Sequence, residues 1–295
     1  CLALLFPASF VWQGVMGRTL PRDAGTAEEG TQLITPQVIE FQLWLAAAGL
    51  ILIFLILPWL ISAFHRVRFF DGFGIRPTSL LAIVAGILLG FGLGPLLLQA
   101  IAWSAQLLEQ MGISNEALSE ALVQRGEEQV AKLKQAPFWL ILFAMAIMPA
   151  VCEELFFRGL LFRALRANMS PWKTILTTAV LFGTFHLISA SGLTPSRLFP
   201  TTIMGIVLGW VCYRSGSVVP GILLHLIHNT MTISFAYFRD DMVEKGWIVQ
   251  DQSNVPIQAI AAGLICAGLG TVILLLVKKP APTGESQAHI DVDAM

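Results

Sequence analysis

The sequence predicts an all-α fold, a polytopic membrane helix bundle of seven to eight transmembrane helices. The 295-residue chain is 56% hydrophobic and only 13% charged, whereas about 25% of the residues of a soluble domain are charged. Seven apolar segments also approach or exceed the roughly 20 residues that a helix needs to cross a bilayer. The net charge of −1 predicts no nucleic-acid partner and no acidic partner.

The predicted spans follow one another along most of the chain. They cover residues 42–64, 79–104, 137–157, 172–190, 198–213, 218–238 and 256–277. The opening stretch 1–16 is apolar but short, and we expect the end of an eighth span or a residual signal-like segment there. The chain starts with Cys rather than Met, so we expect a fragment or a processed form. The polar tail 280–295 is expected to be disordered.

Two local patterns refine this picture. The polar loop 105–136 contains SNEALSEALVQ, which predicts a surface amphipathic helix capped by Ser114 or Asn115.

Glycines recur every four residues in the second full span, at Gly86, Gly90 and Gly94. Small residues at this spacing share one helix face and let a neighbouring membrane helix approach closely. We interpret this stripe as packing rather than function.

Orientation follows from the basic residues of the short loops. If the spans alternate, one side receives Arg66, Arg68, Arg76, Arg158, Arg163, Arg166, Lys173, Arg214, Lys278 and Lys279. The other side receives most of the 19 acidic residues. We therefore expect a multi-pass protein of the cell membrane, with its basic loops and C-terminus in the cytoplasm.

The first polar pattern within an apolar span is VCEELFFR, residues 151–158. Glu154 and Arg158 are an i,i+4 pair with the acid on the N-terminal side, which favours an ion pair. Glu153 points about 100° away from Glu154 and has no partner in its own segment. A carboxylate without a partner in a dry site takes up protons readily, which suits a general base. Alternatively, both glutamates merely mark the cytoplasmic rim.

Two further polar patterns lie on separate spans. FGTFH ends in His186, and HLIHN places His225 and Asn229 one helical turn apart. In all three patterns, the distance along the helix from the polar residues to the nearest basic residue at the cytoplasmic end is about 16–22 Å. A lone histidine in an apolar helix is more often a hydrogen-bonded packing residue, but two at the depth of a free carboxylate favour a site. His228 is interpreted as a second layer or as packing, and Pro149 should kink or loosen its helix.

These groups allow two chemistries that the sequence does not separate. Glu153 with His186 could activate a water molecule while His225 and Asn229 stabilise a tetrahedral intermediate. Alternatively, Glu153, His186 and His225 could bind zinc and leave an open position for water. We favour the scheme that requires no cofactor, because Asn229 is a poor zinc ligand but a good oxyanion donor.

The motifs EExxxR, FxxxH and HxxxN, in this order and on separate spans, are similar to those of the CPBP family. This family includes type II C-a-a-X prenyl endopeptidases and bacteriocin-processing and immunity proteins. The resemblance covers residues 137–235 well and 70–95 more loosely. It implies an eight-helix intramembrane endopeptidase acting on a membrane-embedded or lipidated peptide, with C-a-a-X processing as one form.

The resemblance also implies roles for six residues. Those matching Glu153 and His186 activate water, those matching His225 and Asn229 form the oxyanion pocket, and those matching Glu154 and Arg158 support the site. Members of the family have been called metallo-dependent and metalloprotease-like, while a metal-free glutamate mechanism is also argued. The resemblance therefore leaves zinc open.

We divide the chain into three regions. Residues 1–69 hold the N-terminal apolar segment, an extracytoplasmic loop and the first full span; residues 70–279 form the protease domain, and residues 280–295 the cytoplasmic tail. The first region resembles the end of a permease span, which suggests fusion or association with an ABC-type permease. Two other functions stay open, a non-catalytic membrane scaffold or immunity factor and a proton-coupled transporter component. Against the transporter, matching halves with Gly/Pro-broken helices are not found.

Overall fold

The computed structural model describes residues 35–64, 69–112, 116–189, 195–247 and 255–278. Within these ranges every regular element is a helix, which confirms the all-α prediction. The opening stretch 1–16 and the tail 280–295 lie outside the described residues, as do the proposed caps Ser114 and Asn115.

The helices follow one another with short connections. They are α2 Pro36–Ile51, η2 Leu52–Ile56, α3 Leu57–Phe64, α4 Phe69–Gly72, α5 Leu80–Gln110, α6 Glu116–Leu133, α7 Phe138–Leu142, η3 Phe143–Ile147, α8 Met148–Glu154, η4 Leu155–Leu161, α9 Phe162–Arg166, α10 Pro171–Ser189, α11 Pro195–Ser215, α12 Val219–Tyr237, α13 Arg239–Glu244 and α14 Ile257–Leu276. The segments named η are π-helical and continue the α-helices on either side of them.

The seven predicted spans are helical over most of their described residues, but the predicted number of spans is not confirmed. Among the residues that the structure describes, four helical runs are long and apolar enough to cross a bilayer: Pro36–Phe64, Leu80–Gln110, Phe138–Arg166 and Ile257–Leu276. The helices α10, α11 and α12 are not among them, because they carry more polar side chains. The run through α7–α9 also extends to Arg166, beyond the predicted end at 157, so the first motif lies well inside it.

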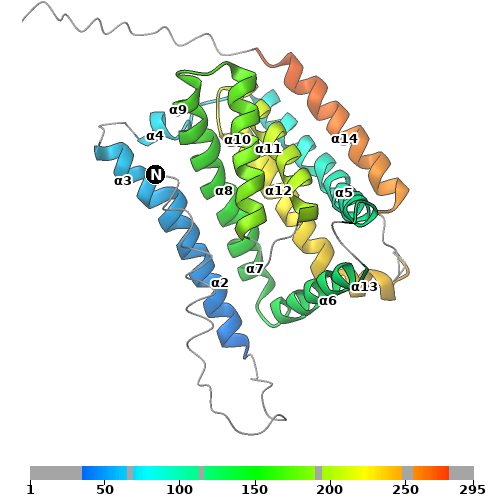
Figure 1. Cartoon of the computed structure of the whole chain (residues 1–295). Coiled ribbons are helices and arrows are strands. Elements are labelled where there is room, and N and C mark those ends of the chain that lie inside the picture. Colours follow the sequence, from blue (N-terminus) through cyan, green and yellow to red (C-terminus); the bar gives the residue numbers. More distant parts are fainter. Residues whose placement is uncertain (1–34, 65–68, 113–115, 190–194, 248–254, 279–295) are drawn as a thin grey trace, which may run out of the picture.

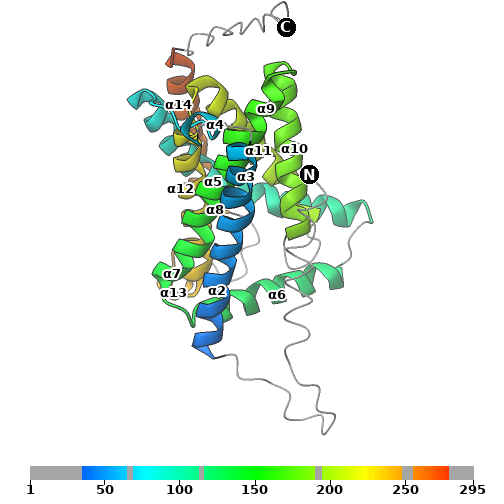
Figure 2. The same cartoon turned by 90° about the vertical axis from the view of Figure 1, so that its left-hand side faces the viewer.

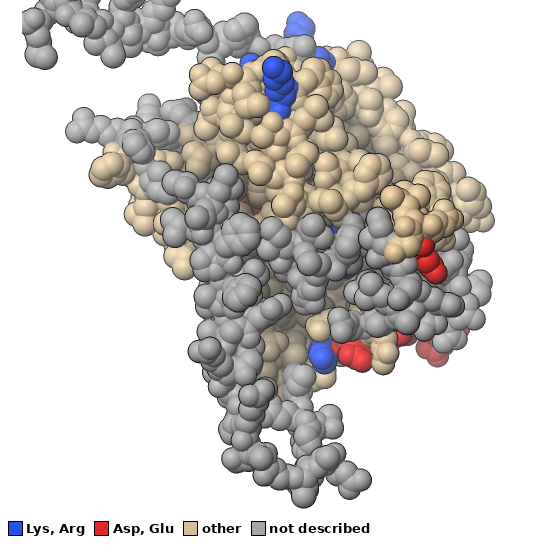
Figure 3. Space-filling model, viewed as in Figure 1, with Lys and Arg blue, Asp and Glu red and all other residues tan. Residues whose placement is uncertain are grey.

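The helices form a bundle with α2 and α3 along one edge and α14 along the opposite edge (Figure 1). Its sides expose many large apolar side chains, including Trp44, Trp59, Trp103, Trp139 and Trp172. Such exposure is costly in water and suits a surface that faces lipid. Figure 3 shows acidic side chains gathered near the end where α6 and α13 lie, with basic side chains at the other end.

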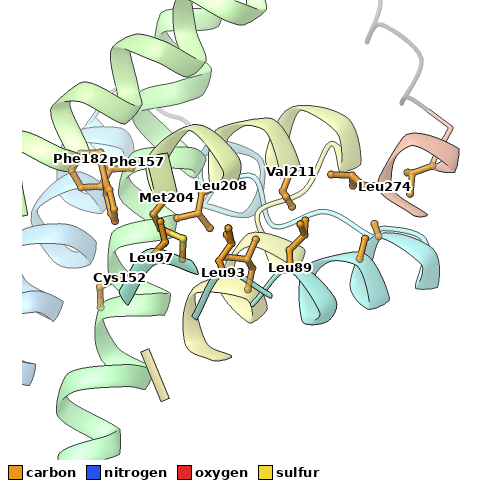
Figure 4. Close-up of a cluster of buried hydrophobic side chains, with 14 of the residues drawn as sticks. Leu89, Leu93, Leu97, Cys152, Phe157, Phe182, Met204, Leu208, Val211 and Leu274 are labelled. Carbon is orange, nitrogen blue, oxygen red and sulfur yellow. The ribbon is translucent and has the colours of Figure 1, made fainter. Parts of the chain in front are cut away.

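The long helix α5 packs against α11, α12 and α14 at the centre of the bundle. A Cβ added to Gly86 would lie 2.5 Å from the carbonyl oxygen of Pro220, and one added to Gly90 would lie 2.8 Å from that of Leu224. Gly94 faces the same helix, α12. This close approach confirms the predicted packing stripe. Figure 4 shows apolar side chains of α5 and α11 meeting beside it, among them Leu89, Leu93, Leu97, Met204, Leu208 and Val211.

The helix α6 crosses the end of the bundle (Figure 2), which confirms the predicted helix in the polar loop. Just after it, Lys134 Nζ donates to Asp240 Oδ2 at 2.7 Å. This hydrogen bond lowers the pKa of the Asp240 carboxyl. The interaction ties the end of α6 to α13.

We expect Gly86→Ala to destabilise the purified protein by about 1–3 kcal/mol, the usual cost of overpacking. The new methyl group would meet backbone rather than a flexible side chain, so α5 and α12 would have to separate. Thermal unfolding in detergent measures the effect. Gly268→Ala is the matched control, because a Cβ there meets nothing within 4 Å. Equal stability of the two variants would contradict the close approach.

Candidate active site

The glutamates of the first motif lie on α8, between two π-helical segments. At the end of η3 the N–H of Met148 donates to the carbonyl of Phe143, and at the end of η4 that of Phe162 donates to Phe157, each five residues back. Pro149 follows η3 and has no N–H to give. The predicted loosening beside the carboxylates is therefore present as a π-helical turn, a feature that is frequent at functional sites.

Glu154 and Arg158 form the ion pair that their spacing predicts, and the structure buries it fully. Arg158 Nη1 donates to Glu154 Oε1 at 2.8 Å, with both side chains at 0% exposure. Arg158 Nη2 donates to the carbonyl oxygen of Gly205 on α11 at 3.1 Å. The guanidinium also lies 4.4 Å from the centroid of the Phe182 ring on α10. A buried charge is tolerated when it is paired and hydrogen-bonded in this way.

His225 joins this pair, a contact that the sequence did not reveal. Its Nδ1 lies 3.1 Å from Glu154 Oε1. The ionised carboxylate only accepts, so Nδ1 is the donor. A neutral imidazole donates from one nitrogen, so Nε2 of His225 carries a lone pair unless the ring is protonated. The predicted oxyanion role of His225 therefore requires the imidazolium form.

Glu153 faces a different histidine. Its Oε2 lies 3.7 Å from Nε2 of His186 on α10, too far for a direct hydrogen bond. This buried oxygen has no hydrogen-bond partner within the described part of the chain. His186 Nδ1 lies 2.9 Å from the carbonyl oxygen of Phe182 and donates to it. Nε2 of the neutral ring therefore presents a lone pair beside the carboxylate.

The site has a closed side and a more open side. Glu153 and His225 are buried, whereas the His186 side chain is 28% exposed. Asn229 is half-buried on α12. His228, on the same helix, is also half-buried. The partly exposed His186 therefore leaves the site accessible to a small polar group.

A cluster of packed aromatic side chains lies beside the site, and the three motifs did not predict it. Phe54 of η2 is fully buried. Its ring centroid lies 5.2 Å from that of Phe156 and 5.1 Å from that of Phe185, with both pairs edge to face. Such pairs add about 0.5–1.5 kcal/mol to area burial. The N-terminal helical run therefore contacts the two segments that carry the first two motifs.

The predicted zinc ligands do not converge. Glu153 and His186 face each other, whereas the Nδ1 atom of His225 contacts Glu154 and only its Nε2 atom would be left for a metal. Over the described ranges, no group of three or more His, Cys, Asp and Glu side chains is placed to hold a metal ion. In this arrangement the residues do not fit zinc.

Three helices thus bring the three motifs together, as their common depth predicted. Residues 135–231, which include all three motifs, match the family model described as type II CAAX prenyl endopeptidase Rce1-like. This match confirms the resemblance to the CPBP family and supports a membrane-bound peptidase at the family level. No curated protein and no solved structure matches the chain.

We expect Glu154→Gln and Arg158→Met each to lower the free energy of unfolding by about 3–5 kcal/mol, because each leaves an uncompensated buried charge. The double variant should lose clearly less than the sum, since it removes both charges. Unfolding of the purified variants measures the coupling. Lys134→Ala, at an exposed pair, is the control and should cost about 0.2–1 kcal/mol. Additive losses at Glu154 and Arg158 would refute the coupling.

Proposed function

We propose that this protein is an intramembrane endopeptidase that hydrolyses a peptide bond with water activated by Glu153 and His186. The proposal rests on two acceptors that face each other, Glu153 Oε2 and His186 Nε2, 3.7 Å apart. Two acceptors do not bond each other, but a water molecule can donate one hydrogen to each. Its oxygen lone pair is then directed outward, toward a substrate. The family match over residues 135–231 supports a peptidase.

In the proposed reaction, Glu153 takes a proton from the water as its oxygen attacks the carbonyl carbon of the scissile bond. The tetrahedral intermediate carries a negative oxygen, which we assign to the amide N–H of Asn229, together with His225 when its ring is protonated. Glu153 then gives the proton to the leaving amine as the C–N bond breaks. The proton is therefore balanced without an external acid.

The buried ion pair gives Glu154 a supporting role in this scheme. A second negative charge beside Glu153 would favour the protonated, inactive form of that base. Arg158 neutralises Glu154 at 2.8 Å and so reduces this repulsion. Glu154 also orients His225 through Nδ1.

We propose that the reaction takes place in the cell membrane, with the basic end of the bundle in the cytoplasm. The substrate would be a membrane-embedded or lipidated peptide, and C-a-a-X processing is the form to test first. The exposed apolar sides of the bundle support a site that such a chain reaches from lipid.

Glu153→Gln should abolish cleavage while leaving the protein folded, because the amide cannot accept the proton. Its stability should be equal or higher, since removing a buried charge without a partner relieves a desolvation cost. The measurement uses purified protein in nanodiscs with a farnesylated C-a-a-X peptide and its unprenylated twin. Glu109→Gln, at an exposed position of α5, is the control. Full activity of the Glu153 variant would rule out this base.

Asn229→Ala should reduce kcat by about 10²-fold or more, as for other oxyanion donors, and should change KM little.

Chelators should leave activity intact, and elemental analysis of active protein should find zinc well below one atom per chain. Stoichiometric zinc that is lost together with activity would overturn the metal-free scheme.

The same variants separate the competing functions. Suppose that the wild-type protein cleaves neither the farnesylated peptide nor its unprenylated twin, and that cells with the Glu153 variant show an unchanged peptide pattern. The protein is then a non-catalytic scaffold or immunity factor. If the variant instead blocks proton-linked uptake, it is a transporter component.

A further inference from the structure

The basic end of the bundle contains a cavity of about 480 Å³. It lies between the chain that follows α4, the helix α9 and the last turn of α11. Its described lining includes the side chains of Arg76, Arg163, Arg166 and Tyr213, and no acidic residue. The described lining therefore brings three positively charged side chains to one cavity. The proposed catalytic residues are not part of it.

The chain that carries this charge is held in place. The positive φ of Gly74, +69°, favours glycine, and the guanidinium of Arg163 rests close to it: a Cβ at Gly74 would lie 2.7 Å from Nε of Arg163. The hydroxyl of Ser217 donates to the carbonyl oxygen of Arg76 at 2.7 Å. These contacts hold the backbone around two arginines before any ligand binds.

Arg166 is also fixed, because its Nη1 donates to the carbonyl oxygen of Met169. The other N–H groups of its guanidinium can therefore donate to a ligand without further ordering of the side chain. Guanidinium groups bind phosphate through two parallel hydrogen bonds, which makes arginine clusters suited to phosphate rather than to a single point charge.

Apolar groups line the same cavity. Leu160 and Phe162 lie beside the arginines, on the helical run that is long and apolar enough to cross a bilayer. The cavity thus joins a positive part to an apolar part at one end of the bundle. Basic pockets between membrane helices bind the headgroups of anionic lipids.

We propose that this cavity binds a phosphate group, presented by the headgroup of an anionic phospholipid. The chemistry of the site is that of a phosphate, so free inorganic phosphate is the second source to examine. The proposal is independent of the peptidase activity.

The distance from the active site argues against a peptide carboxylate as the ligand. Arg163 lies ten residues beyond Glu153 on one helical run, about 15 Å along the axis. A three-residue product beyond the scissile bond spans only about 10 Å when extended. Measured along this axis, the end of a C-a-a-X peptide would therefore stop about 5 Å short of the Arg163 backbone.

The test uses delipidated, purified protein in neutral phosphatidylcholine micelles. Phosphatidylglycerol is titrated in one arm and inorganic phosphate in the other, and thermal unfolding reports binding. Wild type is compared with Arg76→Gln and with the double variant Arg76→Gln/Arg163→Gln. Lys173→Gln is the control, because Lys173 is exposed, near the same end, and outside the cavity.

Phosphatidylglycerol should raise the unfolding midpoint of wild type and Lys173→Gln alike. The apparent affinity should fall about fivefold for each arginine removed. Arg76 is exposed, so its single variant should fold even if the double variant does not. A response to phosphate alone that depends on the arginines would support the phosphate site and assign it to the free anion.

Two results would overturn the proposal. One is that Arg76→Gln responds to both phosphate sources as wild type does. The other is that the variant raises KM for a peptide substrate while its response to phosphatidylglycerol is unchanged, which would make the cavity part of the substrate path.

Discussion

The cost of burying the Arg158 guanidinium constrains the whole centre of the bundle. An unpaired ion in a dry interior costs several kcal/mol, and this one is fully buried. Its partners come from different helices: Glu154 from α8, the carbonyl of Gly205 from α11 and the ring of Phe182 from α10. Through Glu154, the same charge also fixes His225 of α12. These helices must therefore meet at one depth and in one orientation.

This arrangement gives two neighbouring glutamates different environments. Glu154 is neutralised by a cation and accepts from a histidine. Glu153 instead faces His186, with its Oε2 3.7 Å from Nε2. In both glutamates Oε2 is buried without a hydrogen-bond partner among the described residues, so the difference lies in the partners of Glu154 Oε1. Two adjacent carboxylates in different surroundings can therefore have different roles at the same pH, one as part of a structural ion pair and the other as a catalytic base. The sequence separation of one residue is what makes this division possible, because neighbours on a helix point about 100° apart.

The features that could be predicted from the sequence are those set by helical periodicity. The Glu154–Arg158 pair, the glycine face of α5 and the common depth of the three motifs all follow from counting residues along a helix. The partners His225 and Gly205 could not be predicted, because they lie 71 and 47 residues from their contacts. Phe54 belongs to a helix without any motif. The predicted number of spans is not confirmed for a related reason: α10–α12 bury polar groups against protein, so their sequences are less apolar than those of the four described runs that are long and apolar enough to cross a bilayer.

The π-helical turns on either side of α8 make the site sensitive to the deletion of a single residue. Each such turn holds one residue more than an α-helical turn, and one residue corresponds to a rotation of about 100°. The direction in which both carboxylates point around the helix axis therefore depends on the number of residues in these turns as well as on which side chains are present. Loss of one codon within η3 would close that turn into an α-helix and swing α8 away from His186. Every letter of the three motifs would remain, so a relative inactivated in this way could be recognised only by counting the residues between Pro137 and Glu153.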